Sequence, residues 1–116
     1  MTIIESRNRL LPGAARNVGI AASHGKYVAF LAADCVAQPG WIAQRLAAHR
    51  GGADVVATPV VNRNPWNAFA AASHLLLFST RLPGTPSALR QHYGCSYARE
   101  VFARHGMFRS DLRTGE

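Results

Sequence analysis

The sequence holds only two cysteines, Cys35 and Cys95, and their separation matches no metal-binding or redox motif. Both stand beside apolar residues, so we interpret them as small buried thiols. A chain without a disulfide framework agrees with a reducing compartment. We therefore expect a cytoplasmic location, with the cytoplasmic face of a membrane included.

No apolar run is long enough to cross a bilayer. The longest stretch, NAFAAASHLLLFS, is short and carries Ser73 and His74 in its middle. The start of the chain, MTIIESRNRLLPG, lacks the charged-then-apolar layout of a signal peptide. We expect a protein that is soluble or at most associates peripherally with a membrane surface.

Acidic residues are scarce, with 6 against 13 basic ones, and the net charge is +7. Twelve of the basic residues are arginines, but they are scattered from Arg7 to Arg113 without a basic run. The sequence also shows no aromatic platform and no recognition-helix motif. We therefore expect no nucleic-acid partner, whereas the charge does suit an anionic ligand.

The composition is that of a globular domain, because 48% of the residues are apolar and only 16% are charged. A length of 116 residues suits one domain. Apolar β-branched runs alternate with amphipathic stretches that are bounded by proline and glycine. The pattern predicts strands at 2–4, 26–32, 53–61 and 91–98, helices at 12–25, 39–52, 64–78 and 99–106, and a loop at 80–90. This alternation indicates an α/β fold with a largely parallel sheet.

The predicted strand 26–32 leads directly to Asp34 and Cys35. Ligands of parallel sheets bind beyond the carboxyl ends of the strands, where a carboxylate can hold a divalent cation that gathers phosphate oxygens. Aspartate is equally common after a strand as a turn former. From local features alone, both interpretations of Asp34 stay open.

Two longer stretches carry a family resemblance. GAARNVGIAASHGKYVAFLAADCVAQPGWI, residues 13–42, resembles the central segment of the family 2 glycosyltransferases, which typically read G-x-A-x-A-R-N-x-G, A-x-G-x-Y-[VI]-x-F-L-D-x-D and P-x-W. YGCSYAREVFARHGMFRSDLRTGE, residues 93–116, is similar to their small-residue segment, R-x-x-[FL] helix, G-x-F and Gly-Glu-Asp ending. The likeness runs from Ile3 to Glu116. It implies a Rossmann-like GT-A fold, the fold of nucleotide-diphospho-sugar transferases, with a mostly parallel sheet flanked by helices.

The resemblance also implies roles on the donor side. Asp34 matches the last carboxylate of the D-x-D motif, which coordinates Mg²⁺ or Mn²⁺ on the nucleotide diphosphate, and the first carboxylate of that motif falls at Ala32. Arg16 matches the arginine that lies near the nucleotide, and Asn17 is expected to hold the loop by local hydrogen bonds. With alanine at position 32, one acidic side chain stands where the family has two.

On the acceptor side, Gly94, Cys95 and Ser96 match the small residues that let a sugar approach the backbone, although a tightly packed strand explains them equally. Glu116 belongs to the Gly-Glu-Asp ending, whose carboxylate takes the proton from the acceptor hydroxyl, and the aspartate of that pair would be residue 117. We expect Trp41 to pack in the core and the five histidines to be surface or satisfied core residues.

Two functions follow from these residues. The first is a glycosyltransferase that moves a sugar, with inversion, from a nucleotide-diphosphate sugar to a hydroxyl of a saccharide, a lipid-linked acceptor or another acceptor. In that case residues 1–116 are a single partial domain, a central fragment without the first strand and the C-terminal base region. The second is a non-catalytic module that binds a nucleotide or glycan on the same scaffold.

Overall fold

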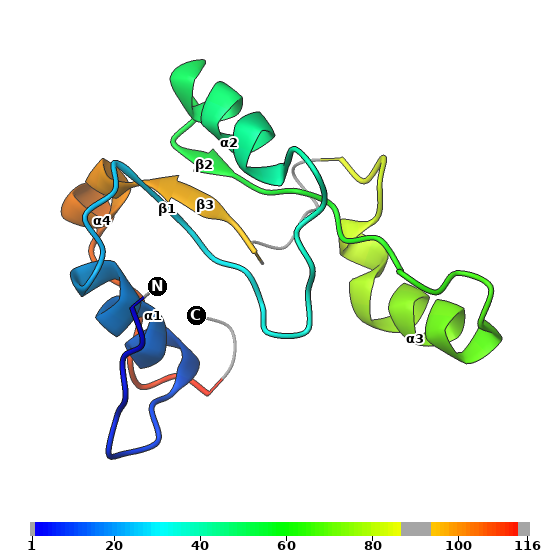
Figure 1. Cartoon of the computed structure of the whole chain (residues 1–116), viewed down its shortest axis with the longest axis horizontal. Coiled ribbons are helices and arrows are strands. Elements are labelled where there is room, and N and C mark those ends of the chain that lie inside the picture. Colours follow the sequence, from blue (N-terminus) through cyan, green and yellow to red (C-terminus); the bar gives the residue numbers. More distant parts are fainter. Residues whose placement is uncertain (1, 87–93, 114–116) are drawn as a thin grey trace. The chain divides into compact units, whose positions relative to one another are not determined.

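A computed structural model describes residues 2–86 and 94–113 of the chain (Figure 1). The chain divides into two compact units, one formed by Met1–Val28 with Tyr97–Glu116 and the other by Ala29–Ser96. The first unit therefore joins the two ends of the sequence. The prediction of a single domain remains a prediction.

Every predicted helix is present, although all four are shorter than their patterns. The helices are α1 (Pro12–Ala21), α2 (Trp41–Arg50), α3 (Ala68–Phe78) and α4 (Arg99–His105), and a 3₁₀ turn, η1 (Ser79–Arg81), follows α3. Pro12 stands in the first turn of α1, where its missing N–H costs nothing. The side chain of Asn67 begins α3 by accepting a hydrogen bond from the Ala70 N–H at 3.0 Å.

Three of the four predicted strands are present as short segments. They are β1 (Tyr27–Ala29), β2 (Val55–Val56) and β3 (Ser96–Ala98). The strand predicted at 2–4 is wrong, because these residues are exposed and no strand pairs with them within the described ranges. The predicted loop at 80–90 is described only as far as residue 86, and it begins within η1.

The strands form one three-stranded sheet in the order β1-β3-β2. The Phe30 N–H donates to the Cys95 carbonyl at 3.1 Å, and the Arg99 N–H donates to the Lys26 carbonyl at 2.9 Å. These pairs run in opposite directions along the chain, so β1 and β3 are antiparallel. The predicted mostly parallel sheet is not confirmed in the described residues. The continuous apolar run at 26–32 predicted a strand that is buried on both faces. That prediction is wrong, because Ala29 and Leu31 are exposed.

In the first unit an aromatic cluster of Tyr97, Phe102 and Phe108 forms part of the packing. The ring centroids of Phe102 and Phe108 lie 5.3 Å and 5.8 Å from that of Tyr97 and 5.7 Å from each other. Such tilted and edge-to-face arrangements are favourable for aromatic rings. The cluster brings together β3, α4 and the segment that follows α4.

Arg99, the first residue of α4, closes the end of α1. Its Nε donates to the Gly25 carbonyl at 2.7 Å, and its Nη1 donates to the Ile20 carbonyl at 3.2 Å. Its Nη2 donates to the Ser23 hydroxyl at 2.8 Å. A cation that satisfies the last carbonyls of a helix also interacts favourably with the helix dipole. One side chain therefore joins the C-terminal end of α1 to the start of α4.

The backbone of Arg109 passes directly against Gly13 in α1. A Cβ at position 13 would overlap the Arg109 carbonyl oxygen, and the Cβ of Phe108 would lie 3.4 Å away. Any residue other than glycine would push the segment after α4 away from α1. The glycine of the A-R-N block is thus required by close backbone approach.

We expect Gly13→Ala to lower the free energy of unfolding by about 1–3 kcal/mol, because the added methyl group overlaps backbone that has no room to move. Gly19→Ala in the same helix is the matched control, since nothing lies within 4 Å of the position that its methyl group would take. The control should stabilise the chain by about 1 kcal/mol through helix propensity. Urea unfolding of both variants measures the difference; equal stability of the two would contradict the close packing at Gly13.

Candidate functional site

The predicted site residues fall in both units. Arg16 and Asn17 belong to the first unit, whereas Asp34 and the segment 94–96 belong to the second. Glu116, the residue next to the expected catalytic base, lies outside the described residues. The described site residues therefore form two groups, one in each unit.

Asp34 stands in a tight turn that begins three residues beyond the end of β1 at Ala29. The Cys35 N–H donates to the Ala32 carbonyl at 3.0 Å, which closes the turn over residues 32–35. Both Ala32 and Asp34 are exposed. β1 ends at Ala29, so Phe30 and Leu31 separate the strand from this turn, and the metal-binding role of Asp34 stays a prediction. The turn also shows that the two open interpretations of Asp34 are compatible, because a turn residue can still present its carboxylate to solvent.

The thiol of Cys35 responds to this carboxylate. Burial raises the pKa of Cys35, and the charge of Asp34 together with a hydrogen bond between the two side chains raises it further. Arg81 acts in the opposite direction. Cys35 is thus a half-buried thiol held in its neutral form beside Asp34, and Cys95 is buried, so neither residue has the features of a reactive cysteine.

The donor set around Asp34 limits the kind of cation that it can hold. Within residues 2–86 and 94–113, no group of three or more histidine, cysteine, aspartate or glutamate side chains is placed to bind a metal ion. Mg²⁺ commonly uses one or two protein carboxylates and takes its remaining ligands from water and substrate phosphates. Asp34 therefore fits a cation shared with a diphosphate and does not fit one that the protein encloses alone.

The segment 94–96 is almost entirely buried. Cys95 and Ser96 are each 1% exposed, whereas Gly94 is half-buried and adopts a φ of +59°. That backbone conformation favours glycine. Of the three residues, only Gly94 leaves backbone accessible, so an acceptor at this segment would meet Gly94 and not the side chains of Cys95 and Ser96.

Arg45 on α2 is only 3% exposed, and its guanidinium group binds this segment. Its Nη2 donates to the Gly94 carbonyl at 2.6 Å and to the Thr58 hydroxyl at 2.8 Å, and its Nη1 donates to the Val56 carbonyl at 3.0 Å. The Trp41 ring lies 4.2 Å from the guanidinium carbon. Burial lowers the pKa of Arg45, yet an arginine side chain stays protonated in proteins. A charged fork thus fixes the Gly94 carbonyl against α2 and the end of β2.

His49, one turn further along α2, completes the same attachment. Its Nδ1 lies 2.6 Å from the Ala53 carbonyl, and its Nε2 lies 2.9 Å from the Ser96 hydroxyl. A carbonyl only accepts, so Nδ1 carries a proton, and in the neutral ring Nε2 accepts from Ser96. Both ring nitrogens are engaged. For His49, the prediction of a satisfied core histidine is confirmed.

The face that α2 buries differs from the apolar face that the sequence predicted. An apolar face was expected, but Ile42 is 66% exposed, while Arg45 and His49 are the buried residues of the helix. Trp41, Arg45 and His49 recur at intervals of four and therefore lie on one face. That spacing is visible in the sequence. The sequence does not show, however, which carbonyl and hydroxyl groups form hydrogen bonds with Arg45 and His49.

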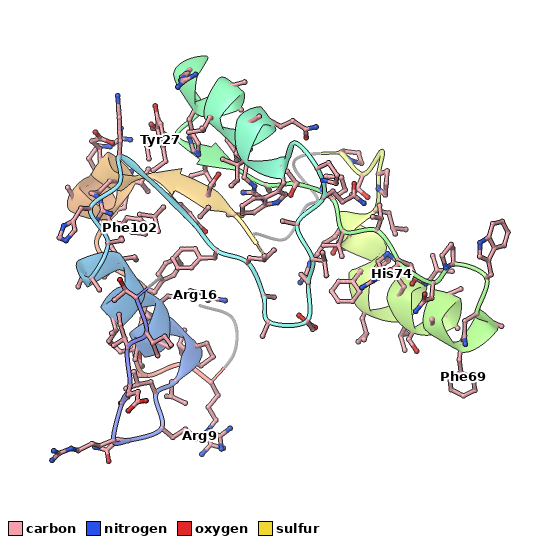
Figure 2. All side chains as sticks on the ribbon, in the orientation of Figure 1. Arg9, Arg16, Tyr27, Phe69, His74 and Phe102 are labelled. Atoms are coloured by element: carbon pink, nitrogen blue, oxygen red, sulfur yellow. The ribbon has the colours of Figure 1, made fainter. Side chains whose placement is uncertain are left out.

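In the first unit, Asn17 pairs with the backbone of Phe108. Its Nδ2 donates to the Phe108 carbonyl at 2.8 Å, and its Oδ1 accepts from the Phe108 N–H at 3.1 Å. The prediction that Asn17 forms local hydrogen bonds is therefore wrong, because its partner lies 91 residues away in the sequence. Arg16 contacts the side chain of the same residue, with its guanidinium carbon 5.5 Å from the centroid of the Phe108 ring. Figure 2 shows Arg16 on α1.

These contacts tie the two sequence blocks together. The A-R-N residues of the first block hold Phe108 of the second, in the segment that leads toward Glu116. Two hydrogen bonds to one residue fix both its position and its orientation. Asn17 thus fixes the backbone of Phe108, in the segment that follows α4.

We expect Arg45→Lys to lower the free energy of unfolding by about 2 kcal/mol, since an ammonium group cannot replace the fork that serves three acceptors at once. Arg50→Lys, at an exposed position on the same helix, is the matched control and should change stability by less than about 0.5 kcal/mol. Urea denaturation of both variants is the measurement. Equal midpoints would show that the buried fork contributes nothing beyond its charge.

Comparison with known proteins gives one match. The model of the family described as glycosyl transferase family 2 matches residues 1–113 of the chain. No curated protein and no solved structure matches the chain significantly. The family match covers the first sequence block, the turn at Asp34 and the second block as far as residue 113, and it implies the GT-A fold. The chain belongs to glycosyl transferase family 2.

Proposed function

We propose that this chain carries the donor turn and the acceptor segment of a glycosyltransferase. The enzyme would move a sugar from a nucleotide-diphosphate sugar to an acceptor hydroxyl with inversion. The observation that carries the proposal is the exposed carboxylate of Asp34 in the turn over residues 32–35, within a family match over residues 1–113. Family membership supports the binding of a sugar donor and an acceptor in general terms.

Asp34 is the residue that would bind the cation of the donor complex. When bound, Mg²⁺ or Mn²⁺ stabilises negative charge on the diphosphate leaving group. The single carboxylate and the alanine at position 32 favour an ion held jointly by Asp34, the phosphate oxygens and water. Asp34 would then help to hold the diphosphate, and the family resemblance implies a place near the nucleotide for Arg16.

On the acceptor side, Gly94 would let a sugar or other hydroxyl acceptor approach the backbone. Arg45 and His49 keep this segment rigid, because they bind the Gly94 carbonyl and the Ser96 hydroxyl. A rigid segment reduces the entropy lost when the acceptor is oriented. A carboxylate of the ending that contains Glu116 would take the proton from the hydroxyl, whose oxygen attacks the anomeric carbon opposite the diphosphate.

The second candidate is a module that binds a nucleotide or glycan without transfer. The observation that favours it is Ala32, which replaces one of the two acidic side chains of the D-x-D motif. Turnover of the full-length protein separates the two functions. Release of free sugar or a glycosylated product from a labelled sugar nucleotide supports the enzyme, whereas donor binding without either product supports the module.

We expect Asp34→Ala to abolish the gain in nucleotide affinity that Mn²⁺ provides. Without the carboxylate the chain has no charged group at this turn to share the cation with the diphosphate. Isothermal titration of UDP and of GDP, each with and without Mn²⁺, measures the effect. We expect the metal to strengthen binding by the wild-type chain at least about tenfold, or about 1.4 kcal/mol, and to leave binding by the variant unchanged.

Asp54→Ala is the matched control, because Asp54 is an exposed carboxylate in the same unit and away from the turn. It should keep the full metal effect. Ala32→Asp restores the second carboxylate at an exposed position and should strengthen the metal effect further. Metal-dependent nucleotide binding that persists in Asp34→Ala would remove Asp34 from the donor site.

A further inference from the structure

Trp41, the first residue of α2, stands at the boundary between the buried and the exposed face of the helix. Arg45, one turn further along, is buried, whereas Gln44 is exposed and Trp41 itself is half-buried. Residues three and four positions apart are neighbours on the surface of a helix. The indole ring therefore has a buried guanidinium group on one side and an exposed amide on the other.

One face of the indole ring is already occupied. The guanidinium carbon of Arg45 lies 4.2 Å from the centroid of the ring, within the range of a cation stacked on an aromatic face. Because Arg45 is 3% exposed, this face of the ring is turned away from water. The exposed part of Trp41 is therefore the opposite face or the edge of the ring. A ring that is held from behind and open in front can stack on a ligand without losing further conformational freedom.

The same guanidinium group joins Trp41 to the segment 94–96. Its Nη2 donates to the Gly94 carbonyl at 2.6 Å, while the group lies over the indole ring. Gly94 is half-buried and is the residue of this segment whose backbone is accessible. Trp41, Arg45 and Gly94 all belong to the second unit. The indole ring thus lies beside the backbone at which the acceptor is proposed to bind, with one planar group between them.

Backbone contacts hold the first turn of α2 in place. The Trp41 N–H donates to the Gln38 carbonyl at 3.0 Å, and the Gln44 N–H donates to the Gly40 carbonyl at 2.9 Å. A Cβ at Gly40 would lie 3.7 Å from the side-chain Nε2 of Gln44, so this side chain folds back toward the start of the helix. The amide of Gln44 and the indole ring of Trp41 therefore share the first turn.

An aromatic face beside a primary amide has the chemistry that recognises a saccharide. The C–H groups on one face of a sugar ring are apolar and slightly positive, so they stack on the negative face of an indole ring. The hydroxyl groups around the sugar require donors and acceptors, and an amide offers both. The exposed groups Trp41 and Gln44 are uncharged, and the charge of Arg45 is buried against three oxygen acceptors. The surface therefore favours a neutral ligand over a phosphate.

We propose that the exposed part of Trp41 stacks against a sugar ring of the acceptor, and that Gln44 forms hydrogen bonds with the hydroxyl groups of that ring. The acceptor is then a saccharide and not a simple alcohol or a protein hydroxyl. The inference rests on the proposed function, because it takes the segment 94–96 as the acceptor side. It makes Trp41, which the sequence pattern placed in the core, a residue that determines acceptor specificity.

Saccharide binding by the Trp66→Ala variant tests the proposal. The chain has two tryptophans, so all indole fluorescence of this variant comes from Trp41. Trp66 is 96% exposed, and its replacement should leave the fold intact. The probes are maltose, cellobiose and chitobiose, each titrated without metal or nucleotide. We expect at least one of them to change the emission of Trp41 in a saturable manner and to protect it from quenching by acrylamide.

Isothermal titration with the sugar that binds compares further variants. We expect Trp41→Ala to weaken binding at least about tenfold, and Trp41→Phe to weaken it less because a smaller ring still stacks. Gln44→Ala should weaken binding about threefold through the lost hydrogen bonds. Gln44 is exposed, so this variant should keep the thermal midpoint of the wild type. Trp66→Ala is the matched control for Trp41→Ala and should bind like the wild type.

Failure of this inference is distinguishable from failure of the proposed function. Equal saccharide affinity of the wild type and Trp41→Ala, or no binding of any probe by the wild type, overturns the inference and leaves the metal effect of Asp34 untouched. Weaker binding of UDP or GDP by Trp41→Ala also overturns it, since the ring would then contact the donor. Saccharide binding that depends on Trp41, in a chain that binds no nucleotide, supports the inference and rejects the glycosyltransferase.

Discussion

The buried guanidinium of Arg45 is the interaction on which the second unit depends most. It joins α2 to the Val56 carbonyl, the Thr58 hydroxyl and the Gly94 carbonyl, so three segments that are distant in sequence share one charged group. A charge removed from water is tolerated only when hydrogen bonds replace its hydration. In the described residues its Nε alone lacks a partner, and the Trp41 ring covers the guanidinium instead. This arrangement fixes the backbone at which the acceptor is proposed to bind.

In the first unit, too, polar side chains form hydrogen bonds with backbone groups, and some of these side chains are neutral. Asn17 satisfies both backbone groups of Phe108, Arg99 satisfies the last carbonyls of α1, and Gly13 leaves room for the Arg109 backbone. Each of these residues acts chiefly on backbone. Polar residues that contact backbone define the path of a loop more strictly than apolar packing does, because hydrogen bonds are directional. The backbone at Phe108 and Arg109 is held in this way.

The proposed donor residue has a different character, because it is exposed. Asp34 can meet a cation and a diphosphate since the turn at 32–35 presents it to solvent. The buried polar contacts of each unit then serve to hold exposed groups in position.

The sequence by itself determined the family and the order of the four helices and three of the four predicted strands. Proline, glycine and apolar periodicity are local signals that locate the helices, but they overran the helix limits, since α1 ends at Ala21 and α3 begins at Ala68. The tertiary structure decided what the polar residues do. No pattern in the sequence indicated that Arg45 is buried, and His49 stayed open between surface and core. Local hydrogen bonds were predicted for Asn17, whereas the partners of all three side chains lie in other segments. It also decided the antiparallel pairing of β1 with β3. Burial of a charge and the direction of a strand depend on groups distant in sequence, and no local pattern records where those groups come to lie.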